Sequence, residues 1–411
     1  MAGSVARREA AIRKCNGSRK GTVIMKIKTV RCLHVQGILD EPIGTCETPK
    51  KQPYDDWRDD GNRNIRFSFI EITTDDGITG LSRSCGLEPA RKACRMFAKS
   101  LVGRDPHDID EIWDELFEIN RRENAWHGHL FIVDMALWDI LGKAAGKPVC
   151  ELLGENPRSE LPVYASMPDC STDSDKLRER ALRLQQEGYP VQKWFLTNVD
   201  QPWFGDKFKT PEEGMADDIR IVRELRETLG PDAGIMLDCY GGWTEEQACE
   251  MIEAIEQYKP YWLEAPVDPR DLETTVRIRE RTSIPIAAGS WVHDTETLKR
   301  VLDSGAYDVW QPDSGSLGGI TGMMRAVDLC REYDITVVPH AGDVATMHFL
   351  AAQDGKLCPF FEYLVLWLKI GQWFYKDRYL PENGALKVPQ APGIGIELDS
   401  DRILEQTHYD G

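Results

Sequence analysis

Six polar residues in the second half of the chain recur at nearly equal intervals, and each closes or follows a short apolar run. They are Asp238, Glu264, Ser290, Asp313, His340 and Glu362, which stand 26, 26, 23, 27 and 22 residues apart. Four runs are especially clear and are followed by charged helical segments: AGIMLDCY, PYWLEAP, YDVWQPD and ITVVPHAG. Unbroken apolar runs are typical of strands buried on both faces of a parallel, helix-covered sheet. A βα unit repeated at this interval predicts an α/β fold with a TIM-type barrel.

The region before the barrel follows a different pattern. Apolar and polar residues alternate in MKIKTVRCLHV and in RFSFIEITTDDGITGLS, which predicts an antiparallel sheet with an Asp-Gly turn. Helical spacing then runs from Pro89 to Ala145, and Gly146 and Pro148 are stop signals. We therefore expect an α+β domain in front of the barrel.

These patterns divide the chain into parts. We expect the α+β domain at residues 25–150 and the barrel at residues 160–375. Residues 1–24 are rich in Arg and Lys and lack the apolar core of a signal peptide. We interpret them as a disordered extension, with Met25 as a second candidate start and a transit peptide as the alternative.

Composition excludes several classes of function. The 411 residues carry a formal net charge of −18, which argues against a nucleic-acid partner because phosphate binding needs a clustered basic surface. The sequence contains no run of about 18 apolar residues, so it predicts no membrane span. The 11 cysteines are scattered and show no zinc spacing, so we expect a reducing, cytoplasmic protein.

Two acidic residues close neighbouring strands of the predicted barrel. Strand ends of a TIM-type barrel share one mouth, so Asp238 and Glu264 should converge there. Paired carboxylates suit Mg²⁺, which completes its octahedron with substrate and water. The alternative is that each acid caps the helix that follows it.

Four further residues at strand ends suggest acid–base chemistry. Asp313 and His340 stand one repeat apart, and a carboxylate beside an imidazole fixes its tautomer and raises its basicity. Lys193 closes the second apolar run, where it could act as an acid/base or neutralise a substrate charge; a surface lysine is the alternative. Glu362 closes the eighth run and could donate to an enolate oxygen if protonated, or be a buried structural acid.

The order of these motifs resembles the mandelate racemase branch of the enolase superfamily. The motifs are QKWF, LDC, QPD, VVPH and FEY, together with DMALWDILGKAAGKPV before the barrel and ENGALKVPQAPGIGIEL after it. The resemblance implies a modified (β/α)7β barrel with a capping domain that residues 376–411 complete. Within the branch, the sequence most resembles rhamnonate dehydratase and related sugar-acid dehydratases.

The resemblance also implies an activity. The family's chemistry is removal of the proton α to a carboxylate, formation of an enolate held by Mg²⁺, and loss of the β-hydroxyl to give a 2-keto-3-deoxy acid. By transfer, His340 oriented by Asp313 is the acid that assists departure of the hydroxyl. Lys193 or a neighbour is the opposing base, and Glu362 stabilises the enolate. Asp238 and Glu264 are the metal ligands.

One position departs from the family pattern. The family has a third metal-binding carboxylate after the fifth strand, and here IPIAAGSWVHD places Ser290 there. A neutral hydroxyl is a poor Mg²⁺ ligand, and Asp294 could replace the carboxylate only if the strand end is remodelled. Two alternatives to a dehydratase therefore remain: an epimerase, racemase or cycloisomerase, and a catalytically silent barrel.

Substrate specificity is expected in the polar segment from Gly37 to Arg66. Within it, Trp57 and Arg66 are the candidates for contact with a small-molecule sugar acid, as are the neighbouring arginines. The family resemblance also leads us to expect a homo-oligomer.

Overall fold

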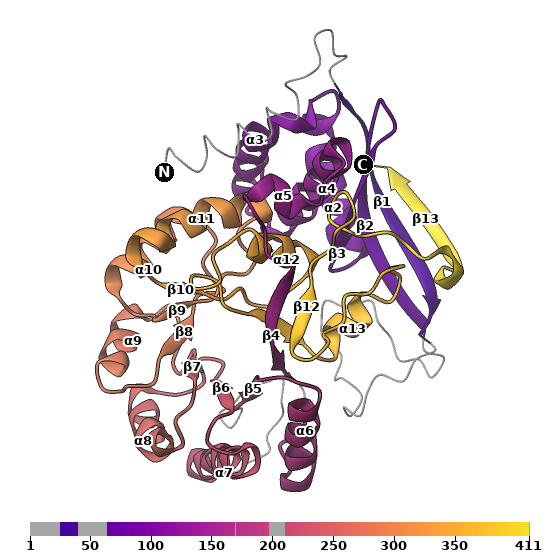
Figure 1. Cartoon of the computed structure of the whole chain (residues 1–411). Coiled ribbons are helices and arrows are strands. Elements are labelled where there is room, and N and C mark those ends of the chain that lie inside the picture. Colours follow the sequence, from indigo (N-terminus) through magenta and orange to yellow (C-terminus); the bar gives the residue numbers. More distant parts are fainter. Residues whose placement is uncertain (1–24, 40–63, 169, 197–209, 411) are drawn as a thin grey trace.

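The computed structural model describes residues 25–39, 64–168, 170–196 and 210–410, which form a capping part and a barrel (Figure 1). The expected extension at residues 1–24 lies outside the described residues.

A four-stranded antiparallel sheet forms one side of the cap. Its order is β13-β1-β2-β3. The strands are β1 (Ile27–Ile38), β2 (Asn64–Thr74), β3 (Thr79–Ser84) and β13 (Glu405–Asp410). The predicted turn joins β2 to β3, and Gly77 has a φ of 93° there, which glycine adopts at no steric cost. Because β13 pairs with β1, the last strand of the chain belongs to the sheet of the first (Figure 1).

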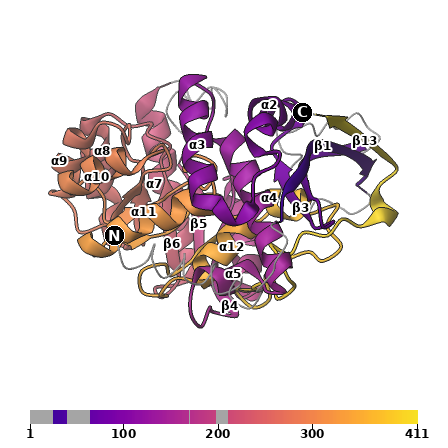
Figure 2. The same ribbon diagram turned by 90° about the horizontal axis from the view of Figure 1, so that it is seen from above.

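Among the described residues, four helices and one 3-10 turn complete the cap. They are α2 (Leu87–Leu101), η1 (Pro106–Asp108), α3 (Ile109–Arg122), α4 (Gly128–Ala145) and α5 (Val149–Leu153). Helix α4 is apolar on nearly all sides, which is typical of a helix inside a core. It ends where the sequence predicts, at Gly146, whose φ of 65° is left-handed. Figure 2 shows α4 between the cap sheet and the barrel helices.

Two buried aspartates of α4 connect it to other parts of the chain. The Asp139 carboxylate accepts hydrogen bonds from the backbone N–H groups of Leu81 and Ile394, both at 2.9 Å. The Asp134 carboxylate accepts from the Thr321 N–H at 3.0 Å and from its hydroxyl at 2.6 Å. Helix α4 is therefore tied to β3, to the C-terminal segment and to the barrel.

Eight parallel strands follow one another around the barrel. The order β10-β9-β8-β7-β6-β5-β4-β11 brings the last strand beside the first. The strands are β4 (Glu160–Ser166), β5 (Val191–Phe195), β6 (Gly234–Asp238), β7 (Trp262–Glu264), β8 (Ile286–Ala288), β9 (Val309–Trp310), β10 (Thr336–Val337) and β11 (Phe361–Leu364). A short strand, β12 (Ala385–Lys387), pairs antiparallel with β4.

Helices connect the barrel strands. They are α6 (Ser174–Gln186), α7 (Pro211–Leu229), α8 (Glu245–Ile255), η2 (Glu256–Tyr258), α9 (Leu272–Arg279), α10 (Thr295–Ser304), α11 (Ile320–Tyr333), α12 (Val344–Ala351), α13 (Trp367–Gly371) and, near the C-terminus, η3 (Ser400–Arg402). Figure 1 shows α6 to α11 around the outside of the strands. The predicted fold class, a TIM-type barrel with an α+β cap, is confirmed.

The interior of the barrel is filled by side chains. A separate buried cluster is contributed by the strands and the residues next to them: Tyr164, Val191, Met236, Trp262, Ala287, Val309 and Val338. Because this layer closes the interior, chemistry is confined to the mouth at the carboxyl ends of the strands.

Nine cysteines lie in the described part of the chain, and no disulfide joins them. A search of the described residues finds no helix that is both long and apolar enough to cross a membrane.

Candidate active site

The ammonium group of Lys193 lies among three carboxylates at the mouth of the barrel. Its Nζ donates to both oxygens of Glu264, at 3.0 and 2.9 Å, and lies 3.4 Å from Asp238 Oδ2. The Oε1 atom of Glu362 is 2.7 Å away. The Lys193 side chain is 1% exposed, so the surface alternative for this lysine is wrong. Four residues singled out from the sequence thus converge.

The register of the strands brings these groups together. Asp238 and Glu264 are direct partners in the β6–β7 ladder, as the equal spacing predicts. Neither caps the next helix, because Thr244 caps α8 and Asp271 caps α9. The amide of Gln311 donates to Glu264 Oε2 at 2.7 Å. The two acids are therefore held in the site itself.

Burial and charge shift the proton affinities of this cluster. Burial works against the charge of Lys193, but the carboxylates of Glu264 and Glu362 outweigh it and raise its pKa well above the ordinary value. Burial, together with the neighbouring Glu264, raises the pKa of Asp238 well above its ordinary value, although Lys193 opposes this. Lys193 is therefore a cation at neutral pH.

The predicted third metal position carries a neutral side chain. Ser290 follows the end of β8 and is half-buried. Asp294, the candidate replacement, accepts hydrogen bonds from the N–H of Thr297 at 2.6 Å and from its hydroxyl at 3.1 Å. It is engaged as the N-cap of α10 and supplies no ligand at the barrel mouth.

These observations test whether the site fits Mg²⁺. Within the described segments, no group of three or more His, Cys, Asp or Glu side chains is arranged to hold a metal ion. The position between Asp238 and Glu264 is taken by the Lys193 ammonium. A second cation beside it would meet strong repulsion in this buried setting. The donor set does not fit the expected Mg²⁺, and no step below depends on one.

His340 and Asp313 form the predicted pair. Each follows the end of its strand, and the two residues form an isolated parallel bridge beyond β9 and β10. The His340 Nδ1–H donates to Asp313 Oδ2 at 3.3 Å, which leaves Nε2 for a substrate. The other Asp313 oxygen accepts from the Ser316 N–H at 2.7 Å. The His340 side chain is 39% exposed and lines a cavity.

The environment of His340 favours its charged form. Burial opposes the charge, but the Asp313 hydrogen bond and the Glu362 carboxylate raise the pKa of His340 to about 9. Burial likewise opposes ionisation of Asp313, yet its hydrogen bond with His340 lowers the pKa of this carboxyl. The pair is an imidazolium–carboxylate at neutral pH and an unusually strong base once deprotonated.

Glu362 is placed at the site, but in a different protonation state from the one predicted. Its Oε2 accepts a hydrogen bond from the Ala341 N–H at 2.7 Å. Burial disfavours its charge, but Lys193 and His340 outweigh burial and lower its pKa to about 2. An ionised carboxylate has no proton to donate. The expectation that a protonated Glu362 donates to an enolate oxygen is therefore wrong.

A cavity of about 1080 Å³ lies over these groups. Lys193, Asp238, Asp313, His340 and Glu362 line its floor, and the cap supplies much of its wall. The cap residues include Phe67, Arg83, Lys92, Arg95, Trp126 and His129. The cavity has the size of a small-molecule site.

The predicted specificity residues are not found in this lining. Trp57 lies outside the described residues. Arg66 is described, and its Nε donates to Gln36 Oε1 at 2.8 Å within the β1–β2 pair. Side chains alternate along β2, so Phe67 faces the cavity and Arg66 does not. Arg83 on β3 and Arg95 on α2 are the cap arginines in the lining of the cavity.

The cap residues that line the cavity, among them Arg83 and His129, were not singled out from the sequence. Arg83 donates from Nη1 to the Gly371 carbonyl at 2.7 Å, and its guanidinium lies 4.7 Å from the Phe67 ring centroid. His129 donates from Nδ1 to the Trp126 carbonyl at 2.7 Å, and burial lowers its pKa, so it is neutral. The alternation of side chains along β3 and the helical spacing of α4 could have indicated which face Arg83 and His129 lie on. These patterns could not have indicated that a cavity lies next to those faces.

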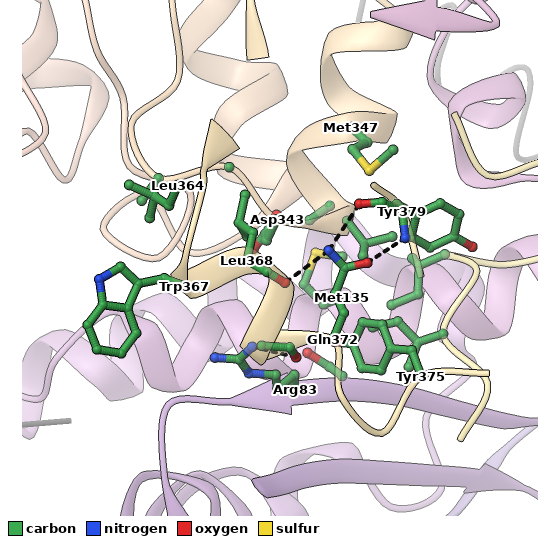
Figure 3. A pocket seen from close by; sticks show the side chains of 18 of the residues that line it. Arg83, Met135, Asp343, Met347, Leu364, Trp367, Leu368, Gln372, Tyr375 and Tyr379 are labelled. Carbon is green, nitrogen blue, oxygen red and sulfur yellow. Dashed lines mark hydrogen bonds between the residues drawn. The ribbon is translucent and has the colours of Figure 1, made fainter. Parts of the chain in front are cut away.

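A second cavity of about 270 Å³ adjoins the first (Figure 3). Arg83, Leu364 and Trp367 line both cavities. Figure 3 shows Gln372 beside it, donating from Nε2 to the carbonyls of Leu368 and Tyr379 at 3.1 and 3.2 Å. These polar groups are paired with each other. The candidate acid–base groups described above line the larger cavity.

Comparisons with known proteins match both parts of the chain. The "Enolase C-terminal domain-like" model matches residues 176–402, and the "Mandelate racemase / muconate lactonizing enzyme, N-terminal domain" model matches residues 59–154. The D-galactarolactone cycloisomerase of Agrobacterium fabrum is 26% identical, over 93% of this chain and 98% of that protein. A putative L-rhamnonate dehydratase of Caldivirga maquilingensis is 28% identical, over 82% of each chain.

A solved structure shares the fold. It is L-talarate dehydratase from Polaromonas sp. JS666, complexed with Mg and L-glucarate. The TM-score is 0.72 at 23% identity, and the match covers 95% of this chain and 99% of that one. A likeness at this identity concerns the fold alone, so the site chemistry of this chain has to be argued from its own residues.

Proposed function

Because the chain belongs to the enolase superfamily, in its mandelate racemase/muconate lactonizing enzyme branch, we propose that it is a sugar-acid dehydratase. Its substrate is an aldonate or aldarate and its product a 2-keto-3-deoxy acid. The Cα–H and Cβ–O bonds break, the hydroxyl leaves as water, and the resulting enol tautomerises to the keto acid. Relatives named as dehydratases support this class of enzyme. The support for the reaction itself comes from the residues of the site.

The His340–Asp313 pair is the observation that carries the proposal. A β-hydroxyl is a poor leaving group unless it receives a proton as the C–O bond breaks. His340 offers that proton from Nε2, because its Nδ1–H is bound to Asp313. The exposed face of the imidazole lines the cavity, where a substrate can reach it.

The same imidazole serves as the base in the simplest scheme. Lys193, the base expected from the resemblance, holds its nitrogen as an ammonium among three carboxylates and has no lone pair to offer. Neutral His340 therefore takes the α-proton, and the imidazolium then hands that proton to the β-hydroxyl. Its raised pKa supports the first transfer because it makes the imidazole a stronger base.

The lining of the cavity supports an acidic substrate. Arg83, Lys92 and Arg95 contribute positive charge from the cap. One carboxylate in the same part of the lining, that of Glu88, lies 3.7 Å from Arg95. A guanidinium is suited to a carboxylate, and neutral His129 is suited to a hydroxyl. We propose a small-molecule substrate held between these cap groups and His340, with no nucleic-acid or membrane partner, in a cytoplasmic homo-oligomer.

One experiment tests the reaction class. Purified protein is incubated with a panel of hexonates, pentonates and aldarates, and 2-keto-3-deoxy acids are detected with semicarbazide, in parallel with His340→Asn. Keto acid from the wild type alone supports the proposal. An epimer or a lactone in its place would support an isomerase, the candidate that the 26% identical cycloisomerase favours. No turnover across the panel would move the chain to the catalytically silent alternative.

A further inference from the structure

The nitrogen of Lys193 lies where the sequence leads us to expect a metal ion. It is 2.9 Å from Glu264 Oε2 and 3.4 Å from Asp238 Oδ2, the two predicted metal ligands. Both carboxylates close strands whose ends converge, so the lysine occupies the space enclosed by these strands.

The surroundings of Lys193 are built to hold a cation. Three carboxylates come from three different strands, β6, β7 and β11, and the side chains of Asp238, Glu264 and Glu362 are 7%, 8% and 1% exposed. Two aromatic rings add to them, with the Nζ 5.4 Å from the Phe195 centroid and 6.0 Å from that of Tyr164. Such a cluster is stable only while its positive charge stays inside it.

Ser290 gives a reason why the Lys193 ammonium and not a divalent metal ion occupies this site. A divalent ion is favoured by several anionic oxygens, and the neutral serine removes one of the expected three carboxylates. The lysine ammonium supplies a single positive charge to the carboxylates that remain. The two cations exclude one another, because a metal bound to Glu264 and Asp238 would touch the ammonium and repel it.

We propose that Lys193 is the resident cation of this site, where its ammonium takes the place of a divalent metal as the counterion of the three carboxylates. This proposal does not depend on the proposed function, because it concerns the cation held in the free protein.

The first measurement is a Mn²⁺ titration of metal-free wild type, followed by the electron paramagnetic resonance signal of free Mn²⁺. The expected result is no saturable binding. Stoichiometric binding of one Mn²⁺ per chain would overturn the proposal. This arm needs no variant and no turnover, so failure of the dehydratase assignment leaves it unaffected.

The second measurement uses Lys193→Met, which leaves the three carboxylates without a cation. We expect a lowered Tm in metal-free buffer and a new one-to-one Mn²⁺ site that restores the Tm. Lys143→Met is the matched control: Lys143 pairs with one carboxylate, that of buried Asp139, and also donates to the Thr79 carbonyl, so its loss should lower the Tm with no recovery on Mn²⁺. A folded Lys193→Met whose Tm and Mn²⁺ binding equal those of the control would refute the cation site. If Lys193→Met does not fold, the wild-type titration still decides.

Discussion

Lys193 Nζ lies 2.7 Å from Glu362 Oε1, a contact between β5 and β11, the two neighbours of β4 in the barrel. The contact keeps Glu362 ionised and removes Lys193 from proton transfer. It also sets the charge next to His340, whose pKa Glu362 helps to raise. The protonation of the whole site therefore depends on this pair.

Replacing Glu362 by Gln tests its charge. Gln resembles the protonated acid, so a role as proton donor would leave the variant active. We expect instead a fall in kcat of about tenfold to hundredfold and a lower Tm, because Lys193 loses an anionic partner. Steady-state kinetics and thermal unfolding measure both, and full activity in Glu362→Gln would restore the donor role.

The pH dependence of kcat/KM tests the base role of His340. This parameter follows the free enzyme, in which His340 must be neutral to accept the α-proton. Since its pKa is raised to about 9, kcat/KM should increase with pH, reach half of its maximum near pH 9 and level off above it. Asp313→Asn removes the charge that raises this pKa, so the midpoint should move down by roughly 1 unit. A wild-type profile that falls between pH 7 and 9 would mean that His340 acts only as an acid.

Arg83 should bind the substrate carboxylate. Losing a charge-assisted hydrogen bond costs about 1.5–3 kcal/mol, so Arg83→Met should raise KM roughly tenfold to hundredfold with a smaller change in kcat. Arg66→Met is the matched control, because Arg66 pairs with Gln36 in the cap sheet. Equal effects of both variants would move the carboxylate site toward Arg66, the residue proposed from the sequence.

The cap should be held on the barrel by a buried contact and not by an exposed one. Asp134→Ala leaves the Thr321 N–H and hydroxyl without their acceptor and should cost about 1–3 kcal/mol of stability. Asp114 pairs with Arg325 across the same two parts but is 65% exposed, so Asp114→Ala should cost about 0–1 kcal/mol. Thermal unfolding compares the two variants, and equal losses would be inconsistent with this account.

Equal spacing was sufficient to predict the barrel because each βα unit is built from local signals. Asp238, Glu264, Asp313 and His340 could be placed at the mouth because a residue at the end of a parallel strand faces the mouth whatever its neighbours are. The protonation state of each group could not be predicted in the same way. The ionisation of Glu362 depends on where a flexible lysine side chain ends.

Contacts between distant segments explain what the sequence pattern could not reveal. Arg83 and His129 reach the cavity only because the cap sheet and α4 pack over the barrel. The N-cap role of Asp294 was readable from its position three residues before Thr297, and it weakens the remodelled metal site. The Lys193 ammonium occupies the predicted metal position because side chains from four strands meet there, and a local sequence pattern does not reveal such a meeting.

The most direct test of the central claim follows the α-proton of a turned-over sugar acid in D₂O by proton NMR, for wild type and His340→Asn. If His340 makes both transfers, the wild type forms the keto acid, and the variant neither forms keto acid nor exchanges the α-proton for deuterium. The loss should be on the order of 10²–10⁴-fold. Retained exchange without dehydration in His340→Asn would show that another group takes the α-proton, and retained dehydration would remove His340 from the mechanism.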